Sequence, residues 1–173
     1  NILNISETAF HCKDYLYMKL TDVRATDPSE ACMSFGNFRT GNYDDEVIKN
    51  IGLQKRRSLL PKIIDGSKIT YPLSDNAAKI TGLKAGTPVS LAYFDAPCSF
   101  LGSGGYDNAK KVGSTVIGTT GVHMKSSAVS EVTLDLDSKS GFTIVLPIPK
   151  QILQLQTNMS GSLNIDWLSS VAS

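Results

Sequence analysis

Residues 89–94 read Val-Ser-Leu-Ala-Tyr-Phe, and this run constrains the fold more than any other part of the sequence. It is apolar on both of its faces, which is typical of a strand that is covered from both sides. Asp95-Ala96-Pro97 follows at once, and an Asp with a Pro in the first turn marks the start of a helix. The sequence therefore predicts a buried strand that passes directly into a helix.

The carboxylate of Asp95 has two roles open to it at this junction. As a helix cap, it would accept a hydrogen bond from a backbone amide, while Pro97 lacks the amide that would otherwise go unpaired. As a reactive group, it would lie at the carboxyl end of a buried strand, where open α/β sheets place their ligand crevices. The spacing alone favours the cap, but one side chain can serve in both roles.

The tetrapeptide Gly118-Thr119-Thr120-Gly121 lies at the end of a later expected strand. Glycines let the backbone approach a phosphate closely, and amides and Thr hydroxyls donate hydrogen bonds to its oxygens. Taken alone, a plain tight turn is the more frequent explanation. Together with Asp95 it suggests phosphoryl transfer to an alcohol, in which a carboxylate accepts the hydroxyl proton while amides and Mg²⁺ neutralise the phosphates.

Hydrophobic spacing and turn residues predict the other elements of the chain. We expect helices over 6–20, 44–52 and 74–82, loops over 21–43, extended segments over 62–65 and 69–73, and strands over 112–117, 132–136 and 142–146, the last two joined as a hairpin. Helices dominate before Asp95 and strands dominate after it. A domain boundary is therefore predicted near residues 106–113.

The composition excludes several classes of protein. The 173 residues carry a formal net charge of +1, and no basic run exceeds the triplet at 55–57, so a nucleic-acid partner is not indicated. Cys12, Cys32 and Cys98 show no metal-type spacing, and a reducing compartment fits them best. No stretch approaches the ~18 apolar residues of a membrane helix, so we expect a soluble, cytoplasmic protein that does not bind a membrane.

Three further titratable residues have weaker claims to a site. His123 follows the glycine turn and could approach a nucleotide, but a hydrogen-bonded histidine without a catalytic role is the more frequent case. Asp135 and Asp137 alternate with leucines, which places both carboxylates on one face of a strand. A solvated face is favoured there over a metal site.

Five blocks of the sequence, in order between residues 13 and 122, resemble motifs of the FGGY family of carbohydrate kinases. The block that leads to Asp95 begins at Thr81-Gly82-Leu83-Lys84-Ala85-Gly86-Thr87-Pro88-Val89 and is similar to the family's TGL.AGTPV…D…LG. The other blocks are Lys13-Asp14-Tyr15-Leu16 with Leu20-Thr21 (KDYL…LTG), Ala25-Thr26-Asp27-Pro28-Ser29-Glu30-Ala31 (ATDYSDAS), Leu59-Leu60-Pro61-Lys62-Ile63 (LLPEV) and Ile117-Gly118-Thr119-Thr120-Gly121-Val122 (LGTSGV). Five matches in the family's order argue against coincidental motifs in an unrelated α/β domain.

The resemblance implies an α/β fold of two actin-like, ribonuclease-H-like domains with the active site in the cleft between them. Residues 1–110 would be the C-terminal part of the sugar-binding N-terminal domain, and residues 111–173 the beginning of the nucleotide-binding C-terminal domain. Asp95 aligns with the catalytic base that deprotonates the sugar hydroxyl, and Gly118, Thr119 and Thr120 align with the phosphate loop. The implied cofactors are ATP and Mg²⁺, the implied partner is a small sugar or polyol, and the family also allows a homodimer.

The resemblance leaves the substrate and the activity open. Phe94-Asp95-Ala96 resembles the branch that acts on L-xylulose, related ketopentoses or erythritol, although Ala96 stands where many members carry Asn or Gln. Family members are considerably longer, and their Asp-x-Gly-Thr-type hairpin and adenosine-binding Gly-Gly segment are absent from these 173 residues. We expect this segment alone to be inactive. Two hypotheses remain, a kinase that transfers the γ-phosphate of ATP and a non-catalytic sensor or remnant that binds sugar or nucleotide.

Overall fold

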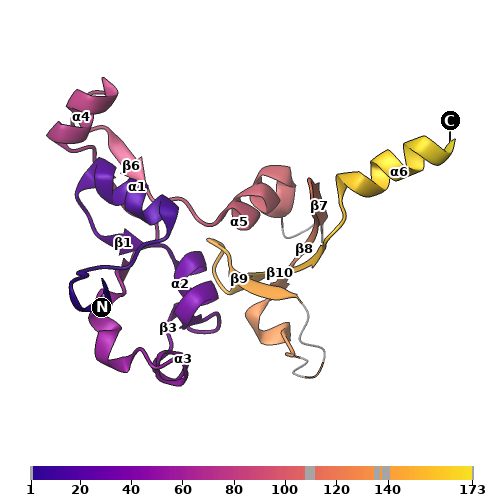
Figure 1. The fold of residues 1–173 in the computed structure, drawn as a ribbon, viewed down its shortest axis with the longest axis horizontal. Helices are drawn as coiled ribbons and strands as arrows, with labels where there is room; N and C mark the ends of the chain where they lie inside the picture. Colours follow the sequence, from indigo (N-terminus) through magenta and orange to yellow (C-terminus); the bar gives the residue numbers. More distant parts are fainter. Residues whose placement is uncertain (1, 108–111, 135–136, 138–140, 173) are drawn as a thin grey trace. The chain divides into compact units, whose positions relative to one another are not determined.

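A computed structural model describes residues 2–107, 112–134, 137 and 141–172 (Figure 1). The chain is a mixed α/β protein that divides into two units, residues 1–94 (unit 1) and 95–173 (unit 2), and each is described by itself. Asp135, half of the predicted aspartate pair, lies outside the described residues. None of the described helices is long and apolar enough to cross a membrane.

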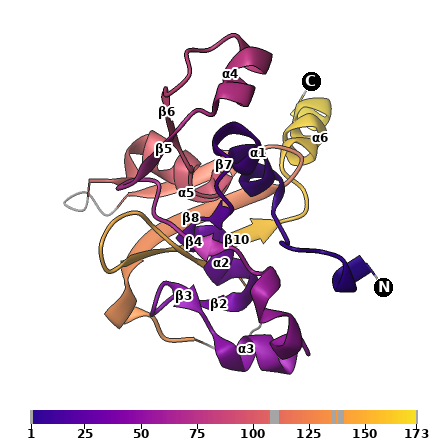
Figure 2. The ribbon, with the colours of Figure 1, turned by 90° about the vertical axis from the view of Figure 1, so that its left-hand side faces the viewer.

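Unit 1 combines short helices with three pairs of very short strands. Its helical elements are η1 (Ile2–Asn4), α1 (Cys12–Thr21), α2 (Pro28–Phe35), α3 (Asp45–Asn50), η2 (Gln54–Leu59) and α4 (Asp75–Thr81). Strands β1 (Ala25–Thr26) and β4 (Lys62–Ile63) pair in parallel, whereas β2 (Gly36–Asn37) with β3 (Asn42–Tyr43) and β5 (Thr70–Pro72) with β6 (Pro88–Ser90) pair antiparallel. The β2–β3 hairpin lies beside α3, at the end of the unit opposite α4 (Figure 2).

The core of unit 1 joins α1 to the β1–β4 pair. Tyr17 of α1, Ala25 of β1, Ile64 and Leu91 are buried together in one apolar cluster. Fully burying a large apolar side chain stabilises a fold by about 1.5–3 kcal/mol, so this cluster fixes α1 over the two parallel strands. The segments that carry the polar side chains described below are thereby held in place.

Two predicted helices of unit 1 form as the sequence indicates, because each has a local start signal. The side chain of Asp44 accepts hydrogen bonds from the amides of Glu46 and Val47 at the start of α3. Ser74 accepts one from Ala77 at the start of α4, which ends at Gly82 with φ +75°. A polar cap of this kind is worth about 1 kcal/mol, and glycine adopts the left-handed conformation at little cost.

Two expectations for the first 43 residues are wrong. The helix expected over 6–20 begins only at Cys12, because the chain before it is extended and the Ala9 amide donates to the Leu59 carbonyl at 2.8 Å. The loops expected over 21–43 contain α2, which the polar composition of this stretch concealed. Asp27 caps α2 and Pro28 occupies its first turn, so the start signal was present in the sequence.

The strand expected over 89–94 is also shorter and less covered than predicted. Strand β6 ends at Ser90, and beyond it Leu91 and Tyr93 are buried while Ala92 is exposed. The chain at residues 90–91 also packs closely against Gly66. The hydroxyl of Ser90 donates to the Gly66 carbonyl at 2.6 Å, and a Cβ added at Gly66 would meet the Leu91 carbonyl oxygen at 1.9 Å, so only glycine permits this approach.

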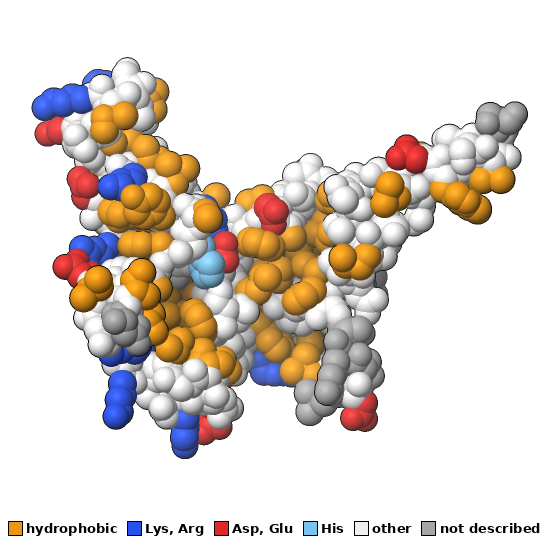
Figure 3. All heavy atoms as spheres, viewed as in Figure 1, with side chains coloured by type: hydrophobic (Ala, Val, Ile, Leu, Met, Phe, Trp, Pro, Cys, Tyr) orange, Lys and Arg blue, Asp and Glu red, His pale blue; other side chains and the backbone are white. Residues whose placement is uncertain are grey.

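Unit 2 is built on a four-stranded antiparallel sheet of order β7-β8-β10-β9. Its elements are α5 (Asp95–Phe100), the π-helical turn η3 (Leu101–Gly105), β7 (Gly113–Ile117), β8 (Gly121–Ala128), η5 (Val129–Glu131), β9 (Phe142–Val145), β10 (Gln151–Asn158) and α6 (Ser162–Ala172). The buried residues of the sheet include Met124, Ile144, Ile152, Leu153 and Leu155. No residue of α6 is buried, and apolar side chains lie along it (Figure 3).

The predicted hairpin between 132–136 and 142–146 is wrong. Residues 132–134 form no strand, Leu136 lies outside the described residues, and β9 pairs instead with β10. The eight-residue β10 was not expected, although its sequence, Gln-Ile-Leu-Gln-Leu-Gln-Thr-Asn, alternates over much of its length. It pairs with β8 on its other side from Gly121 to Ala128, which makes it a central strand of the sheet.

Candidate active site

Asp95 is the first residue of α5, and its side chain is exposed. Among the described residues, no hydrogen bond reaches its carboxylate, so the capping contact that the sequence favoured is not formed. The carboxylate is therefore available to an external group. Its backbone position depends on residue 94, which belongs to unit 1.

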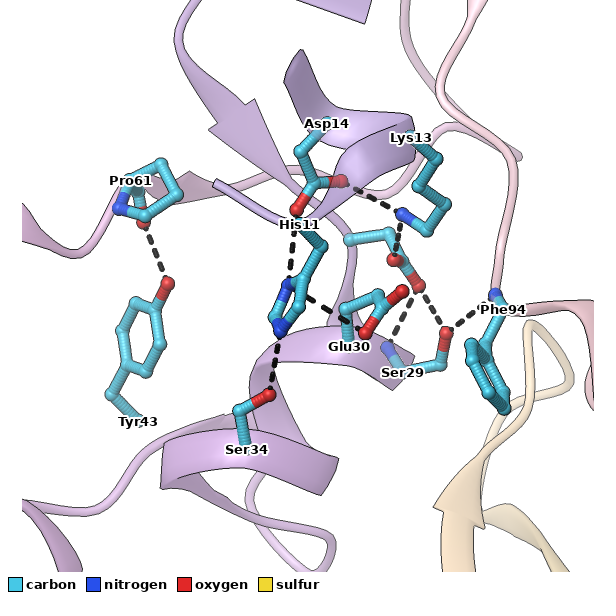
Figure 4. Close-up of polar contacts among 10 residues, drawn as sticks. His11, Lys13, Asp14, Ser29, Glu30, Ser34, Tyr43, Pro61 and Phe94 are labelled. Atoms are coloured by element: carbon cyan, nitrogen blue, oxygen red, sulfur yellow. Dashed lines mark hydrogen bonds and ion pairs between the residues drawn. The ribbon is translucent and has the colours of Figure 1, made fainter. Parts of the chain in front are cut away.

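The amide of Phe94 donates a hydrogen bond to the hydroxyl of Ser29 at 2.9 Å (Figure 4). Ser29 lies in the first turn of α2 and is fully buried. Its own hydroxyl and its amide both donate to the Asp27 Oδ1 atom, the amide at 2.8 Å. A side chain 65 positions earlier in the chain thus fixes the backbone immediately before Asp95.

Lys13 completes this buried arrangement. Its Nζ lies 2.5 Å from Asp27 Oδ2 and 2.8 Å from Asp14 Oδ1, and both carboxylates have an exposed fraction of 0%. Partial burial works against the charged ammonium, but the attraction of Asp27 and Asp14 outweighs it and raises the pKa of Lys13. We call Lys13, Asp27 and Ser29 the buried Lys-Asp-Ser group.

His11 links this group to a third carboxylate. Its Nδ1 lies 3.4 Å from Asp14 Oδ2 and 3.5 Å from Glu30 Oε2, and its Nε2 lies 2.9 Å from the Ser34 hydroxyl. Burial raises the pKa of Glu30, and the nearby Asp14 and Asp27 carboxylates raise it further against the opposing effect of His11 and Lys13. Three acidic side chains, Asp14, Asp27 and Glu30, thus lie around Lys13 and His11.

A second set of residues reproduces the same arrangement at the surface. The amide and hydroxyl of Ser67 donate to Asp65 Oδ1 at 3.0 and 2.6 Å, and Lys68 Nζ lies 2.8 Å from Asp65 Oδ2. Partial burial opposes ionisation of Asp65, but Lys68 and Ser67 outweigh it and lower the pKa of this carboxyl. We call Lys68, Asp65 and Ser67 the surface Lys-Asp-Ser group.

The predicted phosphate loop, Gly118 to Thr120, is the turn between β7 and β8. The carbonyls of Gly118 and Thr119 accept hydrogen bonds from the amides of Ser162 (2.8 Å) and Gly161 (2.9 Å) at the start of α6. The amides of Thr119 and Thr120 donate to no described residue. With its carbonyls bound and these two amides unbound, the turn has the polarity that an anion requires.

His123 is an exposed, hydrogen-bonded residue of β8, beside this turn. Its Nδ1 lies 3.1 Å from the Thr115 hydroxyl and its Nε2 lies 3.2 Å from Asn158 Nδ2. Asn158 Oδ1 accepts the amides of Gly121 and Ser160, so Nδ2 faces the ring as a donor. These contacts link His123 to Thr115 of β7 and to Asn158 of β10, beside the turn.

In the described part of the chain, no group of three or more His, Cys, Asp or Glu side chains could hold a metal ion, so the implied Mg²⁺ has no preformed ligand set there. We therefore derive no step through the metal. Cys12, Cys32 and Cys98 form no disulfide, and burial raises the pKa of Cys32 to about 11. Cys32 is accordingly a protonated thiol at neutral pH rather than a nucleophile.

A cavity of about 230 Å³ in unit 1 lies next to His11. It is lined mainly by apolar side chains, with Ser34 and Thr26 among the polar ones. The Thr26 hydroxyl is buried without a hydrogen-bond partner, but it is also inaccessible to a ligand in the cavity. The cavity contains neither Asp95 nor the turn at Gly118.

The sequence model of the FGGY family of carbohydrate kinases, N-terminal domain, matches residues 3–102. The chain belongs to the FGGY family. This match covers the buried Lys-Asp-Ser group and Asp95, which lie in three of the five blocks that carry the resemblance. The motifs alone give Lys13, Asp27 and Ser29 no role, because the hydrogen bond from Phe94 to Ser29 leaves no local signal in the sequence.

The FGGY relatives of this chain include sugar and polyol kinases. It is 54% identical over 171 residues to the erythritol kinase of Brucella abortus, a match that covers 99% of this chain and 33% of the relative. It is 33% identical over 92 residues to the L-xylulose/3-keto-L-gulonate kinase of Escherichia coli, covering 53% of this chain and 18% of that protein. The chain thus spans about a third of the length of this erythritol kinase.

Solved structures confirm the predicted sugar-kinase fold, present here in part. A xyloylose kinase from Brucella ovis superposes with a TM-score of 0.75 at 20% identity, covering 96% of this chain and 33% of that structure. The xylulose kinase from Rhodospirillum rubrum gives a TM-score of 0.70 at 20% identity over 91% of this chain and 31% of that structure. At these identities the similarity establishes the fold.

Proposed function

We propose that the chain is the central part of an ATP-dependent carbohydrate kinase, in which Asp95 is the general base. Its carboxylate would accept the proton of a substrate hydroxyl while that oxygen attacks the γ-phosphorus of ATP. The observation that carries the proposal is the exposed, unbonded carboxylate of Asp95 in a member of the FGGY family. Such a group needs no rearrangement of the protein before it can receive a proton.

Gly118, Thr119 and Thr120 would hold the phosphates of ATP. Support comes from the turn itself, whose Thr119 and Thr120 amides are unbonded among the described residues while its carbonyls are bound to the start of α6. Backbone amides neutralise phosphate charge without titrating, which suits a site where charge moves during transfer. The family's use of Mg²⁺ would supply further charge neutralisation between the phosphates.

The substrate we propose is a small polyol of the erythritol class, with pentuloses as the alternative. The reason is the 54% identity to an erythritol kinase across 99% of this chain, against 29–33% for three L-xylulose kinases. We also propose that residues 1–110 end the sugar-binding domain and that residues 111–173 begin the nucleotide-binding domain. The family match, which stops at residue 102, supports this division.

The test uses the longer kinase that contains this segment, assayed for ADP release with erythritol, glycerol and pentuloses. Asp95→Asn should lower kcat by about 10²–10⁴-fold and leave ATP binding intact, because the base is lost and the phosphate turn is not. Asp75→Asn is the matched control, since Asp75 is also the exposed first residue of a short helix. Full activity of the Asp95→Asn enzyme would refute the base, and substrate binding without turnover in the unmutated protein would identify a non-catalytic sensor.

A further inference from the structure

The backbone that leads into Asp95 is held by a side chain instead of by a sheet. Strand β6 ends at Ser90, and the Phe94 amide donates to Ser29 Oγ at 2.9 Å. A backbone amide that is removed from water must have a partner, and here the partner is a single hydroxyl. Any change in that hydroxyl therefore acts on Phe94, the residue that immediately precedes the proposed base, Asp95.

The hydroxyl of Ser29 has a fixed orientation. It has one proton, which it donates to Asp27 Oδ1, and this leaves its lone pairs for the Phe94 amide. Asp27 is fixed in turn, because Oδ1 also receives the Ser29 amide and Oδ2 receives Lys13 Nζ. Hydrogen bonds to a charged group are shorter and stronger than neutral ones, so the chain of contacts is stiff.

Helix capping alone does not require this arrangement. The cap of α2 needs only the bond from the Ser29 amide to Asp27 Oδ1, which substitution of the hydroxyl would keep. Burying the Asp27 and Asp14 carboxylates beside Lys13 costs free energy that a water-exposed cap avoids. The surface group makes the same contacts among Ser67, Asp65 and Lys68. Its desolvation cost is lower, because Lys68 is exposed to solvent.

We infer that Ser29 is a positioning residue for Asp95, supported by Asp27 and Lys13, and that it acts through the amide of Phe94. This inference rests on the proposed role of Asp95 as the base. Misplacing a reacting group by about 1 Å can cost about 10²-fold in rate, so one hydrogen bond at this point is enough to affect turnover. Ser29 is fully buried, so in this role it acts through the Phe94 amide and not by direct contact with substrate.

The test is a double-mutant cycle in the longer kinase. Ser29→Ala should lower kcat by about 10–100-fold with little change in KM, because it removes the acceptor that holds the base and leaves the substrate contacts in place. Ser29→Thr keeps a hydroxyl and should restore most of the rate. In the Asp95→Asn background, Ser29→Ala should change kcat less than about twofold, because the group it positions is already gone.

The outcomes separate this inference from the proposed function. If Asp95→Asn is fully active, the base assignment fails and this inference fails with it. If Asp95→Asn is inactive while Ser29→Ala turns over normally, or if the two losses multiply in the double mutant, only the positioning role is refuted.

Two further variants keep the positioning test decisive. Ser67→Ala, which removes the equivalent hydroxyl of the surface group, is the control and should leave kcat unchanged. If Ser29→Ala does not fold, Ser29→Cys offers a weak acceptor of similar size and takes its place in the cycle. Retention of the full rate by Ser29→Cys in that case would refute the inference.

Discussion

The buried and the surface Lys-Asp-Ser groups contain the same residues and make the same local contacts, yet they differ in surroundings and in consequence. Lys13 has an exposed fraction of 26% and Asp27 of 0%, whereas Lys68 is 68% exposed and Asp65 19%. The surface group contacts the side chain of Tyr93 through Asp65, while the buried group bonds the backbone amide of Phe94 through Ser29. Position in the fold, and not the motif, makes the buried group a candidate part of an active site.

The difference in burial is tested most strongly by removing each lysine. Lys13→Met leaves Asp14 and Asp27 buried without their cation, which should lower the free energy of unfolding by about 3–5 kcal/mol. Lys68→Met removes an exposed ion pair and should cost less than about 1 kcal/mol. Urea unfolding followed by circular dichroism measures both, and equal losses for the two variants would show that burial does not separate the groups.

Replacing the aspartate of each group by asparagine should lower the free energy of unfolding by less than removing the buried lysine does. Asp27→Asn still accepts the Ser29 amide and hydroxyl, and Lys13 keeps its contact with Asp14, so one balanced buried pair remains. We expect a loss of about 1–3 kcal/mol in the free energy of unfolding, less than for Lys13→Met. Asp65→Asn should cost less than about 1 kcal/mol, and a larger loss there than for Asp27→Asn would reverse the comparison.

The same comparison shows what the sequence could and could not predict. Caps at Asp44 and Ser74 are local, and helices α3 and α4 were predicted from them. Asp27-Pro28 is an equally local signal, but it lies in a polar stretch without apolar periodicity, so α2 was assigned to loops. Asp95 was identified at the start of its helix, and its proposed role came from motif resemblance.

Contacts between distant segments account for what the sequence analysis missed. The bond between Ser29 and Phe94 joins residues 65 positions apart, and spacing along the chain carries no trace of it. The same applies to the hydrogen bonds from Gly161 and Ser162 to the turn at Gly118. Among the protein's own atoms, a Cβ added at Gly118 would meet only the Thr120 carbonyl oxygen at 3.9 Å, whereas one at Gly161 would lie 2.3 Å from the Gly118 oxygen. The approach of Gly118 to a phosphate stays a prediction.

The smallest predicted effect is a pH dependence of opposite sign in the two regions. Burial raises the pKa of Glu30, so the folded chain keeps a proton that the unfolded chain has lost, and this contribution to stability falls as pH rises through the window between the two values. The pKa of Asp65 is lowered despite partial burial, because Lys68 and Ser67 bind its ionised form. The contribution of Asp65 to stability is fully present above the ordinary carboxyl pKa. It is lost as the pH falls through the lowered pKa that Asp65 has in the folded chain.

Glu30→Gln and Asp65→Asn separate these two contributions. Relative to the unmutated protein, the Glu30→Gln variant should gain stability as pH rises above about 4.3, the ordinary carboxyl value, and the Asp65→Asn variant should lose stability as pH rises through the acid range. Urea midpoints measured from pH 3 to pH 8 give both slopes. Slopes of the same sign for Glu30→Gln and Asp65→Asn would mean that the buried carboxylates near Lys13 are ionised as readily as the surface one, and that the two groups differ only in their contact with Phe94.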